Sequence, residues 1–336
     1  MISRYPWGTS DLKTESKPKK ILRTQGPHET SQEACHVCPA CGNSSAVPTG
    51  VQFYQRSRGE SHWMLCLECR SVFATQPYDR EEEAAHSQTA PWGTAKSAKL
   101  MVKQRMEMYR SVLRLLNQHC PPPALLLDVG CSYGGFLIEA RQAGYSVMGV
   151  DIVAGAVEYV RSIDIPAELA FSIRNASMVA ERTCDILTCL DCNYYWRDQR
   201  AELREAFSKL KPGGYLMMRV VDKAWMFRVG IAIHAFAPST GKLMLAASVN
   251  DHRFSMPVRS LLNLIQACGF QIVYASPRGA MYSDSTRWPV KLAFWFGALA
   301  RDIAGLFIAP GALILARRPL DESIPAIDVL RVSTTP

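Results

Sequence analysis

The feature that most constrains the fold is an alternation of short apolar runs with segments of helical periodicity. The apolar runs predict strands at 125–129, 147–150, 185–190, 215–221, 270–275 and 312–316. Helices are expected at 95–119, 135–143, after 151, at 200–210 and at 260–268. Strands that alternate with helices of this length predict an α/β fold with a doubly wound parallel sheet.

A glycine-rich segment, Asp128-Val129-Gly130-Cys131-Ser132-Tyr133-Gly134-Gly135-Phe136, joins the first expected strand to its helix. Open sheets bind ligands at the carboxyl ends of their strands, where glycines allow close approach and a helix N-terminus offers free N–H groups. The second strand ends in Asp151, whose carboxylate can accept hydrogen bonds from a ribose hydroxyl pair. Because the spacing is not Gly-x-Gly-x-x-Gly, the segment argues against a nicotinamide cofactor.

These segments resemble the class I S-adenosylmethionine-dependent methyltransferases. In that family an acid ends the first strand, a loop of the form Asp-x-Gly-Cys-Gly-x-Gly holds the methionine part of the cofactor, and an acid ends the second strand. Residues 184–191 resemble the fourth strand, 210–216 the turn into the fifth, and 252–255 with 269–270 a later segment. The resemblance covers about residues 95–318 and implies a Rossmann-like, doubly wound seven-stranded sheet and the cofactor S-adenosyl-L-methionine. It assigns cofactor contacts to Asp128, Gly130, Cys131, Gly134, Asp151, Ile152 and Asp191.

Two positions depart from the family pattern. Ser132 stands where the family has its second glycine, which a short side chain tolerates if the backbone needs no positive φ. Tyr194 and Tyr195 stand where many relatives carry Glu-His after the fourth strand, so the enzyme must use another base or none. The candidates for catalysis are His252, which the family segment places at the mouth of the active site, and Tyr195.

Two Cys-x-x-Cys pairs, Cys38/Cys41 and Cys66/Cys69, lie 24 residues apart near the N-terminus. Four thiolates from two such turns close a tetrahedral zinc site with no open position, so the metal is expected to be structural. Buried thiols or a redox pair are the alternatives, and Cys35, three residues before Cys38, leaves the register open. Between Cys35 and Thr75 only three arginines oppose two glutamates, which makes nucleic-acid binding unlikely.

The chain divides into a flexible tail (1–34), a zinc ribbon (35–75), a linker (76–94), a methyltransferase domain (95–320) and a C-terminal tail (321–336). Apolar insertions near 225–250 and 285–310 interrupt the catalytic domain. Their surface can pack on the sheet or on a second subunit, or form a membrane-surface lid for a lipid acceptor. No apolar stretch is long enough to span a bilayer. Eleven cysteines without an apolar signal core indicate a cytoplasmic protein, with contact to a membrane surface left open.

The sequence therefore predicts methyl transfer to a small or amphiphilic acceptor. An N-terminal cysteine ribbon before this kind of domain resembles bacterial small-molecule methyltransferases, including deoxysugar C-methyltransferases and ubiquinone-pathway O-methyltransferases. That resemblance implies a sugar, glycan or lipid-linked acceptor, methylated on oxygen or carbon. A catalytically silent scaffold that binds a partner is the alternative, and RNA or protein methylation is disfavoured because residues 1–94 carry no net charge.

Overall fold

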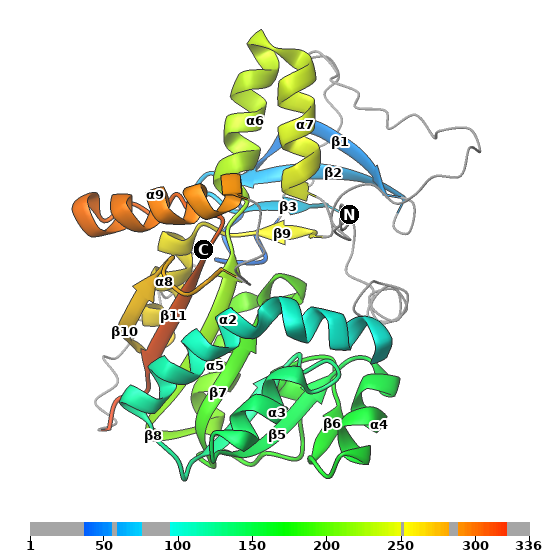
Figure 1. Ribbon diagram of the computed structural model, residues 1–336. Helices are drawn as coiled ribbons and strands as arrows, with labels where there is room; N and C mark the ends of the chain where they lie inside the picture. The colour runs from blue at the N-terminus through cyan, green and yellow to red at the C-terminus, as the bar shows by residue number, and fades with distance from the viewer. Residues whose placement is uncertain (1–36, 56–58, 76–94, 250–251, 282–287, 321–336) are drawn as a thin grey trace, which may run out of the picture.

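The computed structural model describes residues 37–55, 59–75, 95–249, 252–281 and 288–320. Its largest element is a seven-stranded sheet in the order β10-β11-β8-β7-β4-β5-β6 (Figure 1). The strands are β4 (Leu125–Val129), β5 (Ser146–Asp151), β6 (Ala167–Leu169), β7 (Cys184–Leu190), β8 (Leu210–Val221), β10 (Gln271–Ser276) and β11 (Gly311–Arg317). β11 runs antiparallel to both β8 and β10, so the sheet is mixed and not wholly parallel as the alternation had indicated.

Helices cover both faces of this sheet because neighbouring strand residues point in opposite directions. Leu127 and Leu187 belong to the core beneath α5 (Gln199–Lys209) and α8 (Val258–Ala267). Leu126 and Ile186 belong to a second core beneath α2 (Ala95–His119), α3 (Gly135–Gln142) and α4 (Ala154–Ser162). All four side chains are fully buried, which explains why the strands read as continuous apolar runs.

A second, four-stranded sheet has the order β1-β2-β3-β9. Its strands are β1 (Ala46–Gln55), β2 (Gly59–Cys66), β3 (Val72–Ala74) and β9 (Phe254–Ser255). β9 belongs to the catalytic domain, between α7 and α8, and pairs antiparallel with β3. The amide of Ala74 donates to the carbonyl of Arg253 at 2.8 Å. The cysteine-bearing segment and the catalytic domain are therefore joined by a shared sheet.

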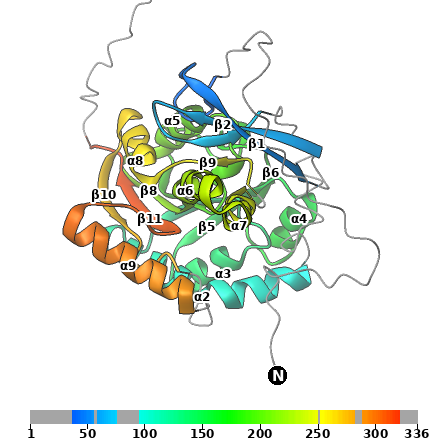
Figure 2. The same cartoon turned by 90° about the horizontal axis from the view of Figure 1, so that it is seen from above.

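The two apolar insertions form helices. α6 (Ala224–Phe236) and α7 (Pro238–Val249) make a hairpin that rises from the end of β8 and projects beyond the sheets (Figures 1 and 2). α9 (Trp288–Ala304) lies between β10 and β11 in the chain and is placed to one side of the base of this hairpin (Figures 1 and 2). Within the part of the chain that the structure describes, none of the helices has the length and apolar character needed to cross a membrane.

The strands and helices expected in the catalytic domain are present, but no elements were predicted from the sequence in the cysteine-bearing segment or in the hairpin, where β1, β2, α6 and α7 lie. β6 and β9, of three and two residues, gave no recognisable pattern, and neither did the 3-10 turns Ile173–Asn175 and Asn193–Tyr195. Strands of this length depend on tertiary pairing more than on local sequence. The tails at 1–34 and 321–336, the linker at 76–94 and Cys35 lie outside the described residues.

Candidate cofactor and metal sites

The glycine loop between β4 and α3 is held in a left-handed backbone conformation at three residues. Gly130 has φ of 74° and Gly134, the N-cap of α3, has φ of 73°. A Cβ on Gly130 would lie 2.8 Å from the Cβ of Cys192. Ser132 also has a positive φ, 49°. This differs from the expectation that a serine is tolerated at this position because the backbone needs no positive φ. The amide of Ser132 donates to Asp151 Oδ2 at 2.7 Å, which offsets a strain of about 1–2 kcal/mol.

Asp151 connects the loops that follow β4 and β5. It is buried, and its second carboxylate oxygen accepts the amide of Val153 at 2.9 Å. Burial raises the pKa of this carboxyl group, and the backbone donors oppose the rise. Each oxygen keeps a further lone pair for a ligand hydroxyl. Ile152, the next residue, is half-buried.

Asp128 is buried at the end of β4 and accepts a hydrogen bond from Thr188 Oγ1 at 2.6 Å. Burial raises its pKa to about 7; the Thr188 hydroxyl opposes the rise, and the charge of Asp151 adds to it. Two carboxylates therefore lie close together, and they favour a ligand with positive charge.

Asp191 follows β7 with φ of 65° and is also buried. It forms an ion pair with Arg219 of β8, and its other oxygen lies 3.9 Å from a guanidinium nitrogen of Arg105 on α2. Neither arginine was predicted from the sequence. The only signal for Arg219 is a charged residue inside the apolar strand 215–221, where a buried arginine needs a partner.

Cys131 is buried with its thiol turned toward β5, and a Cβ on Gly149 would lie 2.6 Å from its Sγ. Burial raises the pKa of the Cys131 thiol well above its usual value, so the group is neutral. Next to the loop, Cys192 Sγ lies 3.0 Å from the carbonyl of Val129 and 2.9 Å from Cys189 Sγ. These thiols pack beneath the loop and shape it.

The two catalytic candidates both contact the ring of Tyr194. His252 is 8% exposed and stacks on Tyr194, with ring centroids 3.8 Å apart and an interplanar angle of 23°. The ring of Tyr195 also contacts that of Tyr194, with the two ring centroids 4.6 Å apart. Both tyrosines belong to the turn that directly follows Asp191, so an imidazole lies beside the loop where relatives of the family carry Glu-His.

The four cysteines predicted to bind metal lie together. Their Sγ atoms are all within 4.8 Å of one another, with Cys38 to Cys69 at 3.6 Å and Cys41 to Cys66 at 3.7 Å. Tetrahedral zinc with bonds of about 2.3 Å requires sulfur atoms about 3.8 Å apart, so the four residues fit such an ion. The carbonyl of Cys69 accepts a hydrogen bond from Ser260 Oγ at 2.7 Å, which ties this cluster to α8.

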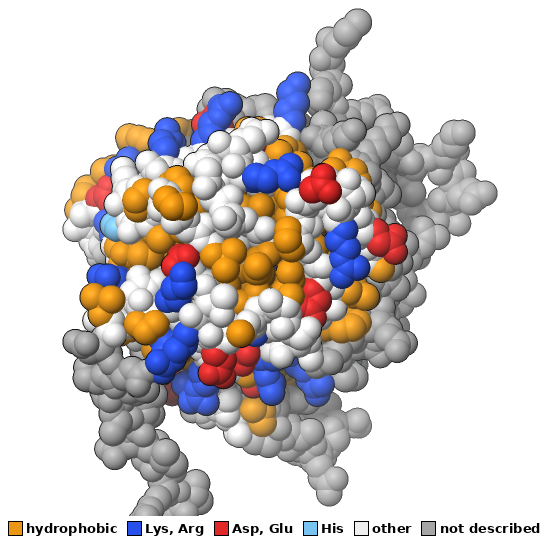
Figure 3. Space-filling model, turned by 90° about the horizontal axis from the view of Figure 1, so that it is seen from below, with side chains coloured by type: hydrophobic (Ala, Val, Ile, Leu, Met, Phe, Trp, Pro, Cys, Tyr) orange, Lys and Arg blue, Asp and Glu red, His pale blue; other side chains and the backbone are white. Residues whose placement is uncertain are grey.

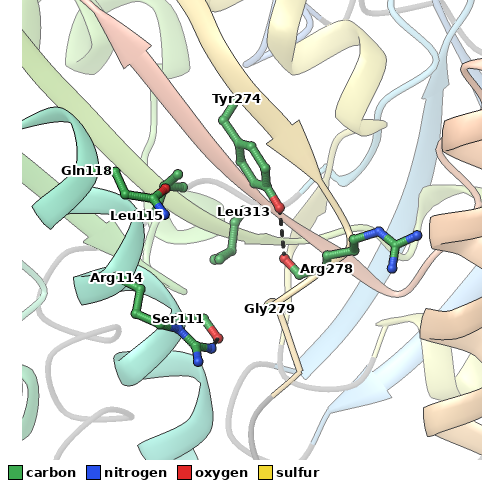
Figure 4. Close-up of a pocket in the computed structure, with 8 residues that line it drawn as sticks. All are labelled: Ser111, Arg114, Leu115, Gln118, Tyr274, Arg278, Gly279 and Leu313. Atoms are coloured by element: carbon green, nitrogen blue, oxygen red, sulfur yellow. Dashed lines mark hydrogen bonds between the residues drawn. The ribbon is translucent and has the colours of Figure 1, made fainter.

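A separate concave site lies between α2 and the strands β10 and β11 (Figure 4). It is lined by Ser111, Arg114, Leu115, Gln118, Tyr274, Arg278, Gly279 and Leu313. Tyr274 Oη donates to the carbonyl of Arg278 at 3.4 Å across it. None of the residues predicted to bind cofactor or metal lines this site, so it is distinct from them.

The strand order, with a single antiparallel strand between β8 and β10, and the glycine loop beside Asp151 define the class I methyltransferase fold. A family profile described as "Methyltransferase domain" matches residues 101–275, and the chain belongs to this family.

Curated relatives carry the name ubiquinone biosynthesis O-methyltransferase. The protein from Pseudomonas fluorescens (strain SBW25) is 31% identical over 113 residues, which are 31% of this chain and 48% of the relative. That from Coxiella burnetii is 27% identical over 179 residues, 49% of this chain and 73% of the relative. The chain spans about half the length (48%) of the first of these.

Solved structures to which this chain is similar include a geranyl diphosphate C-methyltransferase from Streptomyces coelicolor, with a TM-score of 0.46 and 14% identity. The match covers 73% of this chain and 99% of that one. An S-adenosylmethionine-dependent methyltransferase from Mesorhizobium loti has a TM-score of 0.43 and 18% identity over 61% of this chain and 95% of that one.

Proposed function

We propose that this chain transfers a methyl group from S-adenosylmethionine to a small or amphiphilic acceptor. The observation that carries the proposal is the junction of the glycine loop with Asp151 through the Ser132 amide. Asp191, held by Arg219, follows the neighbouring strand β7. Loops from three adjacent parallel strands thus meet at the carboxyl edge of the sheet, where such sheets bind ligands.

The residues at this edge fit the cofactor. Gly130 and Gly134 leave the loop without side chains, so a ligand can approach the backbone and the N-terminus of α3. Asp151 offers acceptors for the ribose hydroxyls. The side-chain oxygen of Asn193 is buried and has no hydrogen-bond partner among the described residues, which leaves an acceptor available beside Asp191.

The bound cofactor supplies an electrophilic methyl group on a sulfonium. Because transfer is an in-line displacement, the chain mainly has to orient the acceptor and exclude water. When the acceptor must lose a proton, His252 is our candidate base, with Tyr195 as the second. The stack on Tyr194 holds the His252 ring in one plane.

The acceptor class is inferred from the surroundings of the site. The hairpin that begins directly after β8 is apolar, and the relatives are named for ubiquinone biosynthesis. Both support an amphiphilic acceptor such as a sugar, a glycan or a lipid-linked molecule, methylated on oxygen or carbon. A catalytically silent scaffold is the second candidate, favoured only by the two tyrosines where relatives carry Glu-His.

We assign a structural role to zinc held by Cys38, Cys41, Cys66 and Cys69. The cysteine-bearing sheet pairs through β3 with β9, and His252 lies two residues before β9. Folding of the ribbon therefore orders the segment that carries the candidate base.

The test is calorimetric titration of S-adenosylmethionine and S-adenosylhomocysteine into wild type and Asp151→Ala. We expect at least a tenfold loss of affinity in the variant, equal to about 1.4 kcal/mol, because a charge-assisted hydrogen bond is removed. Asp185→Asn, an acid at the amino end of β7, is the control and should bind as wild type does. No binding by folded, zinc-loaded wild type would favour the silent scaffold.

A further inference from the structure

The helical hairpin α6–α7 ends in an apolar tip that nothing in the described chain covers. From Val229 to Thr240 the sequence contains no Lys, Arg, Asp or Glu. At the tip, Phe236 is 91% exposed, and Leu243 on the returning helix is 72% exposed. Burial of a phenylalanine or leucine side chain stabilises by about 1.5–3 kcal/mol, so exposure of both to water is unfavourable.

The base of the hairpin is well packed, so the tip cannot fold back to bury Phe236 and Leu243. A Cβ on Gly241 would lie 2.4 Å from the Cα of His234, so the two helices touch backbone to backbone near the tip. At the base of the hairpin, Phe227 and Leu245 are fully buried and pack with Trp63 of the cysteine-bearing sheet. The exposed tip is therefore a fixed feature of the fold.

α9 presents a second apolar surface beside the hairpin. Its exposed stripe consists of residues at helical spacing: Trp288, Leu292, Trp295, Phe296, Leu299 and Ile303. α9 lies to one side of the hairpin base, with its axis roughly perpendicular to that of the hairpin (Figures 1 and 2). It therefore runs parallel to a membrane surface that the hairpin enters end-on. Tryptophans are enriched at the interface between lipid headgroups and acyl chains.

The charges around the hairpin favour an anionic membrane surface over a second copy of the chain as its partner. Residues 223–249 contain Lys223, Arg228 and Lys242 and no Asp or Glu. The opposite face of the molecule, by contrast, shows basic and acidic side chains interspersed (Figure 3). In a two-fold dimer the same patch faces itself, and its cations would repel one another. A surface of anionic headgroups complements both the cations and the apolar tip.

We infer that the α6–α7 hairpin inserts its tip into an anionic bilayer surface, with the α9 stripe at the level of the headgroups. α6 is 13 residues long and spans about 20 Å, enough for the tip to reach the acyl region while the base stays outside. Because the hairpin begins at the carboxyl end of β8, this orientation turns the catalytic edge toward the membrane. The inference does not depend on which acceptor is methylated.

The test is co-sedimentation of the full-length, zinc-loaded protein with vesicles of phosphatidylcholine, alone or mixed with an equal part of phosphatidylglycerol. Wild type should pellet with the mixed vesicles and much less with phosphatidylcholine. Phe236→Ser/Leu243→Ser should lower the partition coefficient at least tenfold, and Lys242→Glu should weaken binding only to the anionic vesicles. Val273→Ser, an exposed apolar residue on β10, is the matched control and should bind as wild type does.

Two outcomes would overturn the inference. One is equal pelleting of wild type and Phe236→Ser/Leu243→Ser. The other is a wild-type dimer by light scattering that becomes monomeric in this double variant, without vesicle binding, since the tip would then be a contact between copies. Cofactor affinity, measured in parallel, should be the same in wild type and double variant, which separates failure of this inference from failure of the proposed methyl transfer.

Discussion

The junction between the hairpin and the cysteine-bearing sheet can be tested by one substitution in α6. Phe227 is fully buried, and its ring centroid lies 5.6 Å from that of Trp63. Its neighbours in this core come from α7 and from β1 and β3, so Phe227→Ala would leave a cavity where these elements meet. Phenylalanine-to-alanine substitutions in cores cost about 3–5 kcal/mol, and we expect a loss in this range.

The assay is urea denaturation followed by tryptophan fluorescence, with zinc present throughout. Phe236→Ala is the matched control, because the same substitution nine residues along the same helix removes a side chain that is 91% exposed. It should change the free energy of unfolding by no more than about 0.5 kcal/mol. A loss below about 1 kcal/mol in Phe227→Ala, or equal losses in both variants, would refute the reasoning that this core joins hairpin and ribbon.

Two further predictions concern the cofactor and the metal. Burial holds the pKa of Asp128 at about 7, and a cationic cofactor favours its ionised form, so affinity for S-adenosylmethionine should rise about tenfold between about pH 6 and pH 8. Titration across this range should show proton release, and Asp128→Asn should abolish the dependence. Elemental analysis should find one zinc per chain, lost in Cys66→Ser/Cys69→Ser together with the ordered ribbon. A metal-free protein that stays fully folded would contradict the zinc site.

Much of the fold was predictable because its central strands and helices follow local patterns of apolar residues. The apolar runs 125–129 and 185–190 became central strands, and the helix at 95–119 has the predicted bounds. Parallel strands that are buried on both faces are apolar at nearly every position, which makes them visible in a sequence. β6 and β9 were missed because their few residues are held by pairing partners distant in the chain.

In the candidate site, too, some features were predictable from local sequence and others were not. The sequence by itself determined the glycine loop, Asp151 at the next strand end and the cluster of four cysteines, because each depends on a short spacing that chemistry imposes. Only the tertiary structure placed His252 against Tyr194 and paired Asp191 with Arg219 and Arg105. These contacts join residues that are far apart in the chain and belong to different elements, and local sequence carries no record of which distant side chains will meet.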